Sequence, residues 1–199
     1  MNRPDWHIVE QWITPGSRVL DLGCGDGSLL AHLITRRRVT AVGLELTDAA
    51  VAACVERGLS VIQADLDQGV SDWFAPQSFD YVIVSQTIQA MRNPEILLEQ
   101  MLRIAREGIV TFPNMGYWRN RWQLGVRGHM PVNEALPNPW YNTPNIHLCT
   151  LTDFEALCAD LGIEILERAV VDQERRSSAW LRLWPNGFGE HAIYRLKKR

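Results

Sequence analysis

The distribution of apolar and polar positions divides the chain into short apolar runs separated by longer amphipathic segments. Five runs are rich in Val, Ile and Leu without polar alternation, which is typical of strands that are buried on both faces. These runs are 17–22, 40–46, 60–65, 79–86 and 108–114. Three segments between them place apolar residues at helical spacing, at 27–36, 48–58 and 93–108. The alternation of strand and helix predicts a doubly wound α/β fold, in which a mostly parallel sheet is flanked by helices.

Capping residues indicate where two of these helices begin and end. Asp48 is expected to cap the second helix, and Gly58 is expected to end it. Asn93 is the expected N-cap of the third helix, with Pro94 at its first helical position. The third helix therefore has the better defined start.

The last part of the chain predicts one more helix and two closing strands. The helix is expected to begin near Thr152, which has capping-box spacing with Glu155, and to end at Gly162. The segments 163–173 and 191–199 alternate between apolar and polar residues and are expected to pair at the sheet edge. These two strands bring the predicted sheet to seven.

Residues 115–150 interrupt the pattern and are expected to be an insertion in a single domain that spans 1–199. The segment holds several Trp and Tyr residues among prolines and has little periodicity, apart from one short helix expected at 116–126. The insertion is therefore interpreted as an addition to the α/β domain rather than as a second domain.

Composition and charge narrow the classes of partner. The chain has 199 residues and a formal net charge of -3, so it has no overall basic field that would favour nucleic acid or an anionic membrane. The four cysteines form no C-x-x-C pair, and no metal site is expected. The first residues lack signal-peptide features, and no apolar run approaches the roughly 20 residues that cross a bilayer. We therefore expect a cytoplasmic protein.

The first apolar strand runs into a glycine-rich turn in the stretch VLDLGCGDGSLL at 19–30. Gly23, Gly25 and Gly27 form G-x-G-x-G, whereas the dinucleotide fingerprint is G-x-G-x-x-G. Asp21 places a carboxylate beside the turn, where it would repel a pyrophosphate but not a cationic ligand. The pattern resembles the S-adenosylmethionine motif of class I methyltransferases, in which the glycines admit the methionyl part and the acidic residue helps to hold its ammonium group.

Further polar residues follow the next strands, at the edge where parallel sheets bind ligands. Glu45 ends the second strand, where a carboxylate accepts ribose hydroxyls in other doubly wound nucleotide-binding folds. Asp65 ends the third strand, where the methyltransferase pattern places an acidic residue against the adenine amino group. The candidate residues for binding S-adenosylmethionine or S-adenosylhomocysteine are Asp21, Gly23, Cys24, Gly25, Gly27, Glu45, Leu46, Asp65, Leu66, Ser85 and Gln86.

Candidates for methyl-transfer chemistry are few. No Asn/Asp-Pro-Pro-Tyr motif follows the fourth strand, which argues against amino groups of nucleobases or glutamine as acceptors. No Pro-Cys nucleophile is present for cytosine chemistry. The histidines of the insertion are His129 and His147, for which a structural role is the alternative to catalysis. His147 is the candidate catalytic residue.

The aromatic residues of the insertion admit several interpretations. The alternatives are a lid over a small acceptor, a surface for a protein partner, a surface on which RNA bases stack between arginines, and a plug that fills the end of the sheet. The residues assigned to a substrate or partner surface are Trp118, Trp122, Trp140, Tyr141 and His147.

Several longer segments together resemble one family. RVLDLGCGDGSLL, IVTFPNMGYWRNRWQL and WYNTPNIHLCTLTDFEALC are similar to segments of the MetW family of methionine-biosynthesis proteins, and the likeness runs from Asp5 to Asp172. The resemblance implies a methyltransferase fold that acts with a homoserine O-acyltransferase as its activating or regulatory partner. Because S-adenosylmethionine is the downstream product of methionine, a binding site for it on such a protein favours the interpretation that the protein is a sensor. The alternatives are a small-molecule methyltransferase and an RNA methyltransferase.

Overall fold

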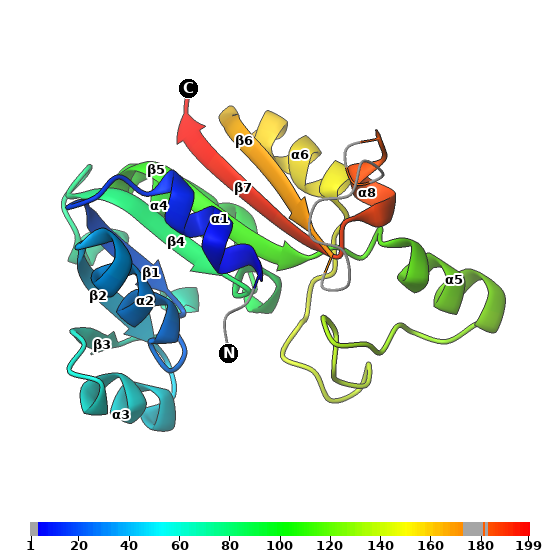
Figure 1. Cartoon of the computed structure of the whole chain (residues 1–199), viewed down its shortest axis with the longest axis horizontal. Coiled ribbons are helices and arrows are strands. Elements are labelled where there is room, and N and C mark those ends of the chain that lie inside the picture. Colours follow the sequence, from blue (N-terminus) through cyan, green and yellow to red (C-terminus); the bar gives the residue numbers. More distant parts are fainter. Residues whose placement is uncertain (1–3, 173–180, 182) are drawn as a thin grey trace.

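Residues 4–172, 181 and 183–199 are described by a computed structural model, shown in Figure 1. The strands are β1 (Arg18–Leu22), β2 (Thr40–Glu45), β3 (Val61–Gln63), β4 (Phe79–Ser85), β5 (Ala105–Pro113), β6 (Ile163–Val171) and β7 (His191–Lys198). The α-helices are α1 (Pro4–Trp12), α2 (Ser28–Arg37), α3 (Asp48–Glu56), α4 (Pro94–Ile104), α5 (Trp118–Arg127), α6 (Leu151–Asp160) and α8 (Pro185–Phe188). Short 3-10 turns are η1 (Leu66–Gln68), η2 (Ser71–Trp73) and η3 (Ile88–Ala90).

The seven strands form one sheet in the order β3-β2-β1-β4-β5-β7-β6. The first five strands of the chain pair in parallel, whereas β7 runs antiparallel to both β5 and β6. The predicted doubly wound α/β fold with a seven-stranded, mostly parallel sheet is confirmed. The reversal of β7 has a consequence for function, because it brings the start of β7 to the edge where the parallel strands end.

Successive residues of the central strands face opposite sides of the sheet, as the period of two requires. Val19 packs with α1 and α2 on one face, whereas Leu20 packs with α4 on the other. Ile83 and Val84 of β4 divide between the two faces in the same way. Because both faces are covered, the strands need apolar residues at every position, which explains the unbroken Val and Ile runs.

The boundary between α4 and β5 differs from the prediction of a helix over 93–108. The helix ends at Ile104 and β5 begins directly at Ala105, which pairs with Phe79 of β4. Glu107 lies in the strand and accepts a hydrogen bond from Arg195 Nε of β7 at 2.6 Å. The residues 105–107 continue the helical pattern in sequence, but sheet pairing with distant residues decides their conformation.

Two of the three predicted N-caps are wrong, and one is confirmed. Thr47, and not Asp48, is the N-cap of α3. The capping box of α6 is formed by Thr150 and Asp153, two residues earlier than the predicted pair, with Asp153 Oδ2 accepting from Thr150 N at 2.9 Å. Both pairs have the capping-box spacing, so the sequence pattern does not distinguish them, and the structure shows which pair forms the box. Asn93 caps α4 as predicted.

The predicted stop signals of α3 and α6 are also in place. Gly58 and Gly162 directly follow the last helical turns with φ of 74° and 65°, a left-handed conformation that favours glycine. Gln173, the last residue of the strand predicted at 163–173, lies outside the described residues.

Two α-helices of the described residues, α1 and the four-residue α8, were not expected from the sequence pattern. The N-terminal α1 places Val9 and Ile13 in the apolar layer formed with α2, where both side chains are almost fully buried. An isolated helix of nine residues is only marginally stable in water, so this packing against the sheet stabilises α1.

The insertion contains α5 close to the expected position, and residues 128–150 form no further helix or strand. Figure 1 shows α5 and the chain that follows it to one side of the sheet, with α8 as the nearest labelled helix, and Arg121 of α5 lies 5.3 Å from the ring centre of Trp184, the N-cap of α8. None of the helices in the described part of the chain has the length and apolar character needed to cross a membrane.

Candidate functional site

The glycine turn joins the end of β1 to α2 and is held against β2 by its backbone. Gly23 N and Cys24 N both donate to the carbonyl oxygen of Leu44, at 2.9 and 3.0 Å. Gly23, Gly25 and Gly27 have φ of 78°, 57° and 74°, values that side chains disfavour. The G-x-G-x-G spacing is therefore explained by three left-handed residues in one tight turn.

The three glycines differ in what surrounds them. A Cβ on Gly23 would lie 2.5 Å from Thr87 Oγ1, and a Cβ on Gly27 would lie 2.3 Å from Leu59 Cδ1. A Cβ on Gly25 would meet no protein atom within 4 Å. Gly23 and Gly27 thus allow close packing within the chain, whereas Gly25 borders open space at the sheet edge.

Glu45 at the end of β2 is bonded to the glycine turn. Its Oε2 accepts from Gly25 N at 2.8 Å, and its Oε1 accepts from Leu46 N at 2.8 Å and Thr47 N at 3.3 Å. A carboxylate offers about four acceptor positions. Glu45 therefore fixes the turn and keeps limited capacity for hydroxyl groups of a ligand.

Asp21 lies within β1 beside the turn and is only 1% exposed. Burial and the charge of Asp21 raise the pKa of the Cys24 thiol far above its usual range. Cys24 Sγ and Cys54 Sγ lie 3.8 Å apart, and burial also raises the pKa of Cys54. Both thiols remain protonated and pack as small apolar groups beneath the turn.

Asp65 follows β3 and forms the N-cap of η1. Its Oδ1 accepts from Asp67 N at 3.0 Å, and its Oδ2 accepts from Gln68 Nε2 at 3.3 Å. Leu66 is half-buried at the start of the same turn, and Leu46, across from it at the end of β2, is 56% exposed. The predicted adenine-side residues thus lie on two adjacent strand ends.

The end of β4 carries a second polar group of side chains. Gln86 has a left-handed φ of 56°, which is uncommon for a residue with a side chain. Gln86 Nε2 lies 3.3 Å from His191 Nδ1, and Ser85 Oγ lies 3.3 Å from Thr111 Oγ1. Sequence reasoning missed His191 because only the antiparallel pairing of β7 brings it to the ends of β4 and β5.

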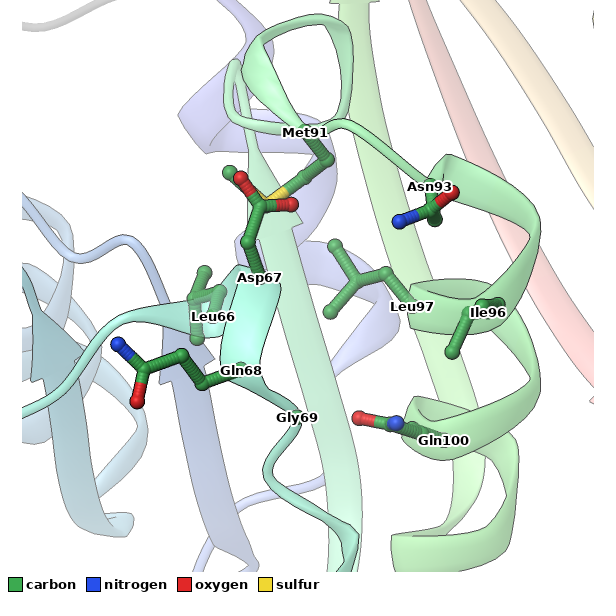
Figure 2. A pocket seen from close by; sticks show the side chains of 9 residues that line it. All are labelled: Leu66, Asp67, Gln68, Gly69, Met91, Asn93, Ile96, Leu97 and Gln100. Atoms are coloured by element: carbon green, nitrogen blue, oxygen red, sulfur yellow. The ribbon is translucent and has the colours of Figure 1, made fainter.

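A cavity of about 210 Å³ lies between η1 and α4 (Figure 2). Side chains of Ile96, Leu97 and Gln100 on α4 face the η1 turn across it. Leu66 is the one member of the predicted cofactor set that lines the cavity. The cavity therefore adjoins the predicted adenine side and does not include the glycine turn.

The predicted aromatic residues of the insertion are exposed and do not join the strand-end group. Trp140 and Tyr141 are 73% and 75% exposed and contact each other edge to face. Trp118 and Trp122 on α5 are about half exposed. These side chains do not plug the sheet, because they lie outside its apolar layers.

His147, the candidate catalytic residue, binds the backbone of the segment that follows β4. Its Nε2 donates to the carbonyl oxygen of Arg92 at 3.3 Å, and its backbone N donates to the carbonyl oxygen of Gln89 at 2.9 Å. The structure therefore gives His147 two hydrogen bonds to the backbone between η3 and α4.

Comparison with protein families gives one match over nearly the whole chain. The family model described as methionine biosynthesis protein MetW matches residues 3–196. The chain is 37% identical over 183 residues to the bifunctional methionine biosynthesis protein MetXA/MetW of Rhodopirellula baltica, a match that covers 86% of this chain and 29% of that longer protein.

A second relative is an annotated methyltransferase. The chain is 29% identical over 109 residues to the ubiquinone biosynthesis O-methyltransferase of Hahella chejuensis, which covers 53% of this chain and 45% of that protein. The chain thus spans less than half the length of either relative.

Two solved structures with the same fold are methyltransferases. The enzyme from Mesorhizobium loti superposes with a TM-score of 0.71 at 15% identity and covers 99% of both chains. Phosphoethanolamine N-methyltransferase 2 of Haemonchus contortus, in complex with S-adenosylmethionine, gives a TM-score of 0.68 at 16% identity over 96% of this chain and 51% of that chain. At these identities the likeness concerns the fold, which is that of class I methyltransferases.

Proposed function

The chain belongs to the MetW family of methionine biosynthesis proteins, and from this premise we propose that it binds S-adenosylmethionine or S-adenosylhomocysteine and acts as the activating or regulatory partner of a homoserine O-acyltransferase. The observation that carries the ligand proposal is the convergence of Asp21, Gly25, Glu45 and Asp65 at one edge of the sheet. The observation that carries the partner proposal is the exposed aromatic surface of the insertion.

The residues at the sheet edge fit the chemistry of an adenosyl amino acid. The open space beside Gly25 admits a ligand close to the backbone, and buried Asp21 supplies negative charge for an ammonium group. Glu45 and Asp65 supply carboxylate acceptors for ribose hydroxyls and for an amino group. S-adenosylmethionine also brings a positively charged sulfonium, which this acidic edge favours over a pyrophosphate.

The partner proposal rests on a fused relative and on the surface of the insertion. In Rhodopirellula baltica a MetW-like segment is joined to a MetXA segment in one bifunctional protein, and we take that second segment as the type of partner. Exposed tryptophans flanked by arginines are typical of protein interfaces. On α5, Arg119 lies 5.5 Å from the centre of the Trp118 ring, so the surface presents charge and apolar area together.

A ligand site for the end product of the pathway, on a protein that assists one of its early steps, supports a regulatory role. The two sites would be coupled through one chain, and such coupling is typically worth about 1 to 3 kcal/mol. Occupancy of the sheet edge is therefore expected to change the activity or affinity of the acyltransferase.

Calorimetric titration tests the ligand proposal. Wild-type protein is expected to bind S-adenosylmethionine or S-adenosylhomocysteine with micromolar affinity, about -8 kcal/mol. Asp21→Asn keeps the shape but removes the charge, and Glu45→Gln removes a charged acceptor, so each is expected to weaken binding by about 1 to 3 kcal/mol. Glu99→Gln, at an exposed position on α4, is the matched control. Absence of heat with both ligands at wild type would contradict the proposal.

Co-purification with a homoserine O-acyltransferase, followed by an acyltransferase assay over a range of S-adenosylmethionine concentrations, tests the partner proposal. A rate that depends on this chain and responds to the ligand supports it. A rate that is the same with and without this chain would contradict it.

One observation favours a second candidate function, methyl transfer to a small molecule. Ser85, Gln86, Thr111 and His191 form a polar cluster at the ends of β4, β5 and β7, beside the predicted ligand edge. A methyl acceptor would have to lie near that edge to meet the sulfonium. Transfer of a labelled methyl group to a small acceptor, lost in His191→Ala but kept in the exposed-site control His129→Ala, would support this function.

A further inference from the structure

A short segment of the insertion crosses the ends of β4 and β5. This strap, residues 146–149, follows the exposed aromatic pair and directly precedes α6. Ile146 N and His147 N both donate to the carbonyl oxygen of Gln89 in η3, each at 2.9 Å. At its other end, Cys149 O accepts from Met115 N at 3.0 Å, just after β5. The strap is therefore bound at the ends of two neighbouring strands.

The strap is also linked to the adenine side of the predicted ligand site. His147 Nε2 donates to the carbonyl oxygen of Arg92 at 3.3 Å. The backbone N of the same Arg92 donates to Asp67 Oδ1 at 2.9 Å, and Asp67 N donates to Asp65 Oδ1 at 3.0 Å. Four residues thus connect the cap of η1 with the strap through hydrogen bonds.

A second connection starts from the glycine turn. Thr87 Oγ1 donates to the carbonyl oxygen of Gly23 at 3.4 Å, and Thr87 directly precedes η3. Gln89 Nε2 donates to the carbonyl oxygen of Gln86 at 2.9 Å, while its own carbonyl oxygen holds the strap. The strap therefore rests on η3, which contacts the ligand edge on its other side.

A ligand would change the contacts at the start of the first connection. Asp65 accepts one hydrogen bond at each carboxylate oxygen, from Asp67 N and from Gln68 Nε2, so an amino group that binds Asp65 adds a further hydrogen bond at the cap of η1. The hydrogen bonds of η1 then differ between the ligand-free and ligand-bound protein. A difference of this kind is what a ligand needs in order to shift an equilibrium at a distance.

We propose, on the basis of the proposed function, that the strap 146–149 transmits occupancy of the adenosyl site to the partner surface, and that Asp67 and His147 are the positioning residues of this relay. The strap carries Ile146 and Leu148, which are 56% and 41% exposed and follow Trp140 and Tyr141 of the proposed partner surface along the chain. Ligand binding tightens η1 and thereby the strap, and the partner meets a more ordered surface.

Hydrogen exchange of the peptide that covers the strap tests the proposal in this chain alone. Saturating S-adenosylhomocysteine is expected to slow exchange of the strap amides by at least about fivefold. Asp67→Ala removes the acceptor for Arg92 N, and His147→Ala removes the side-chain link to Arg92. In both variants the ligand still binds, but the slowing is lost.

Matched controls separate the relay from general destabilisation. Asp160→Ala changes an exposed carboxylate at the end of α6, and His129→Ala changes an exposed histidine elsewhere in the insertion. Both control variants are expected to keep the full ligand effect on the strap.

The outcomes distinguish this proposal from the proposed function. Ligand heat in calorimetry with unchanged exchange of the strap overturns the relay and leaves ligand binding intact. Full slowing that persists in Asp67→Ala and His147→Ala also overturns it. No heat with either ligand overturns the proposed function and the relay with it.

Discussion

The proposed ligand edge, which is the glycine turn with the ends of β1, β2 and β3, and the insertion differ in how far their apolar side chains are buried. At the ligand edge, Leu20, Leu22 and Leu44 are fully buried beneath a turn whose backbone hydrogen bonds are satisfied. In the insertion, Trp140 and Tyr141 are about three-quarters exposed. The apolar area of the sheet stabilises the fold, whereas that of the insertion remains available for association.

The two regions also differ in how they are held. The sheet is bound by continuous strand pairing with helices on both faces, whereas residues 114–150, all of which the structure describes, contain α5 as their single regular element. The strap is the part of the insertion that binds the sheet edge. Substitutions in the sheet are therefore expected to change the stability of the fold, whereas substitutions in the insertion are expected to change association with a partner.

The largest expected effect separates stability from association. Phe112 is fully buried and contacts the rings of Phe154 and Tyr194. The substitution Phe112→Ala is therefore expected to lower the free energy of unfolding of the protein by about 3 to 5 kcal/mol. Trp122→Ala on exposed α5 is expected to change it by less than about 0.5 kcal/mol. Urea denaturation measures both. Equal losses would mean that the insertion is part of the same core.

The next effect concerns ligand binding without loss of the fold. Gly25→Val fills the open space at the turn and is expected to weaken S-adenosylhomocysteine binding at least about 100-fold, or about 2.7 kcal/mol. Gly16→Val is a matched control, because Gly16 also has positive φ, 80°, and open surroundings. Both variants carry a similar backbone strain of about 1 to 2 kcal/mol. Equal ligand affinity in the two variants would contradict the assigned site.

A smaller effect is expected at the partner surface. Trp140→Ala should weaken acyltransferase binding by about 2 kcal/mol, as for a hot-spot aromatic residue, while ligand affinity remains unchanged. Trp73→Ala, an exposed tryptophan of η2 outside the insertion, is the control. Surface plasmon resonance with immobilised acyltransferase measures both. Loss of ligand affinity in Trp140→Ala would indicate a lid over the ligand instead.

The smallest expected effect is the dependence of folding stability on pH that the buried thiols cause. Burial raises the pKa of Cys158 in α6 and of Cys149 in the strap to about 12, above the ordinary value of 9.0. The folded state therefore holds these protons while the unfolded state releases them, so stability is full below about pH 9 and falls as pH rises towards 12. Each thiol contributes up to about 1.4 kcal/mol per pH unit.

Denaturation at pH 8 and pH 10.5 measures this loss, and Cys158→Ala is expected to reduce it. Alkylation at pH 8 extends the comparison, because Cys149 is expected to react faster than Cys158 if the strap opens locally. Equal protection of both thiols would show that the strap opens only with the whole domain.

The order of strands and helices could be predicted from the sequence, because it depends on local patterns. Apolar runs without polar alternation predicted the buried strands. The three glycines predicted the turn after β1, and the structure shows that all three have positive φ. The helix end at Ile104 could not be predicted, since pairing of Ala105 with Phe79 overrides the helical pattern.

The sequence by itself determined that Asp21, Glu45 and Asp65 gather at one sheet edge, because parallel strands end on the same side. Only the tertiary structure decided that Gly25 alone among the three glycines faces open space. It also brought His191 to Gln86 and placed the strap on η3, since both contacts join residues far apart along the chain. Local sequence sets φ, period and strand ends, whereas the surroundings of a side chain depend on distant atoms.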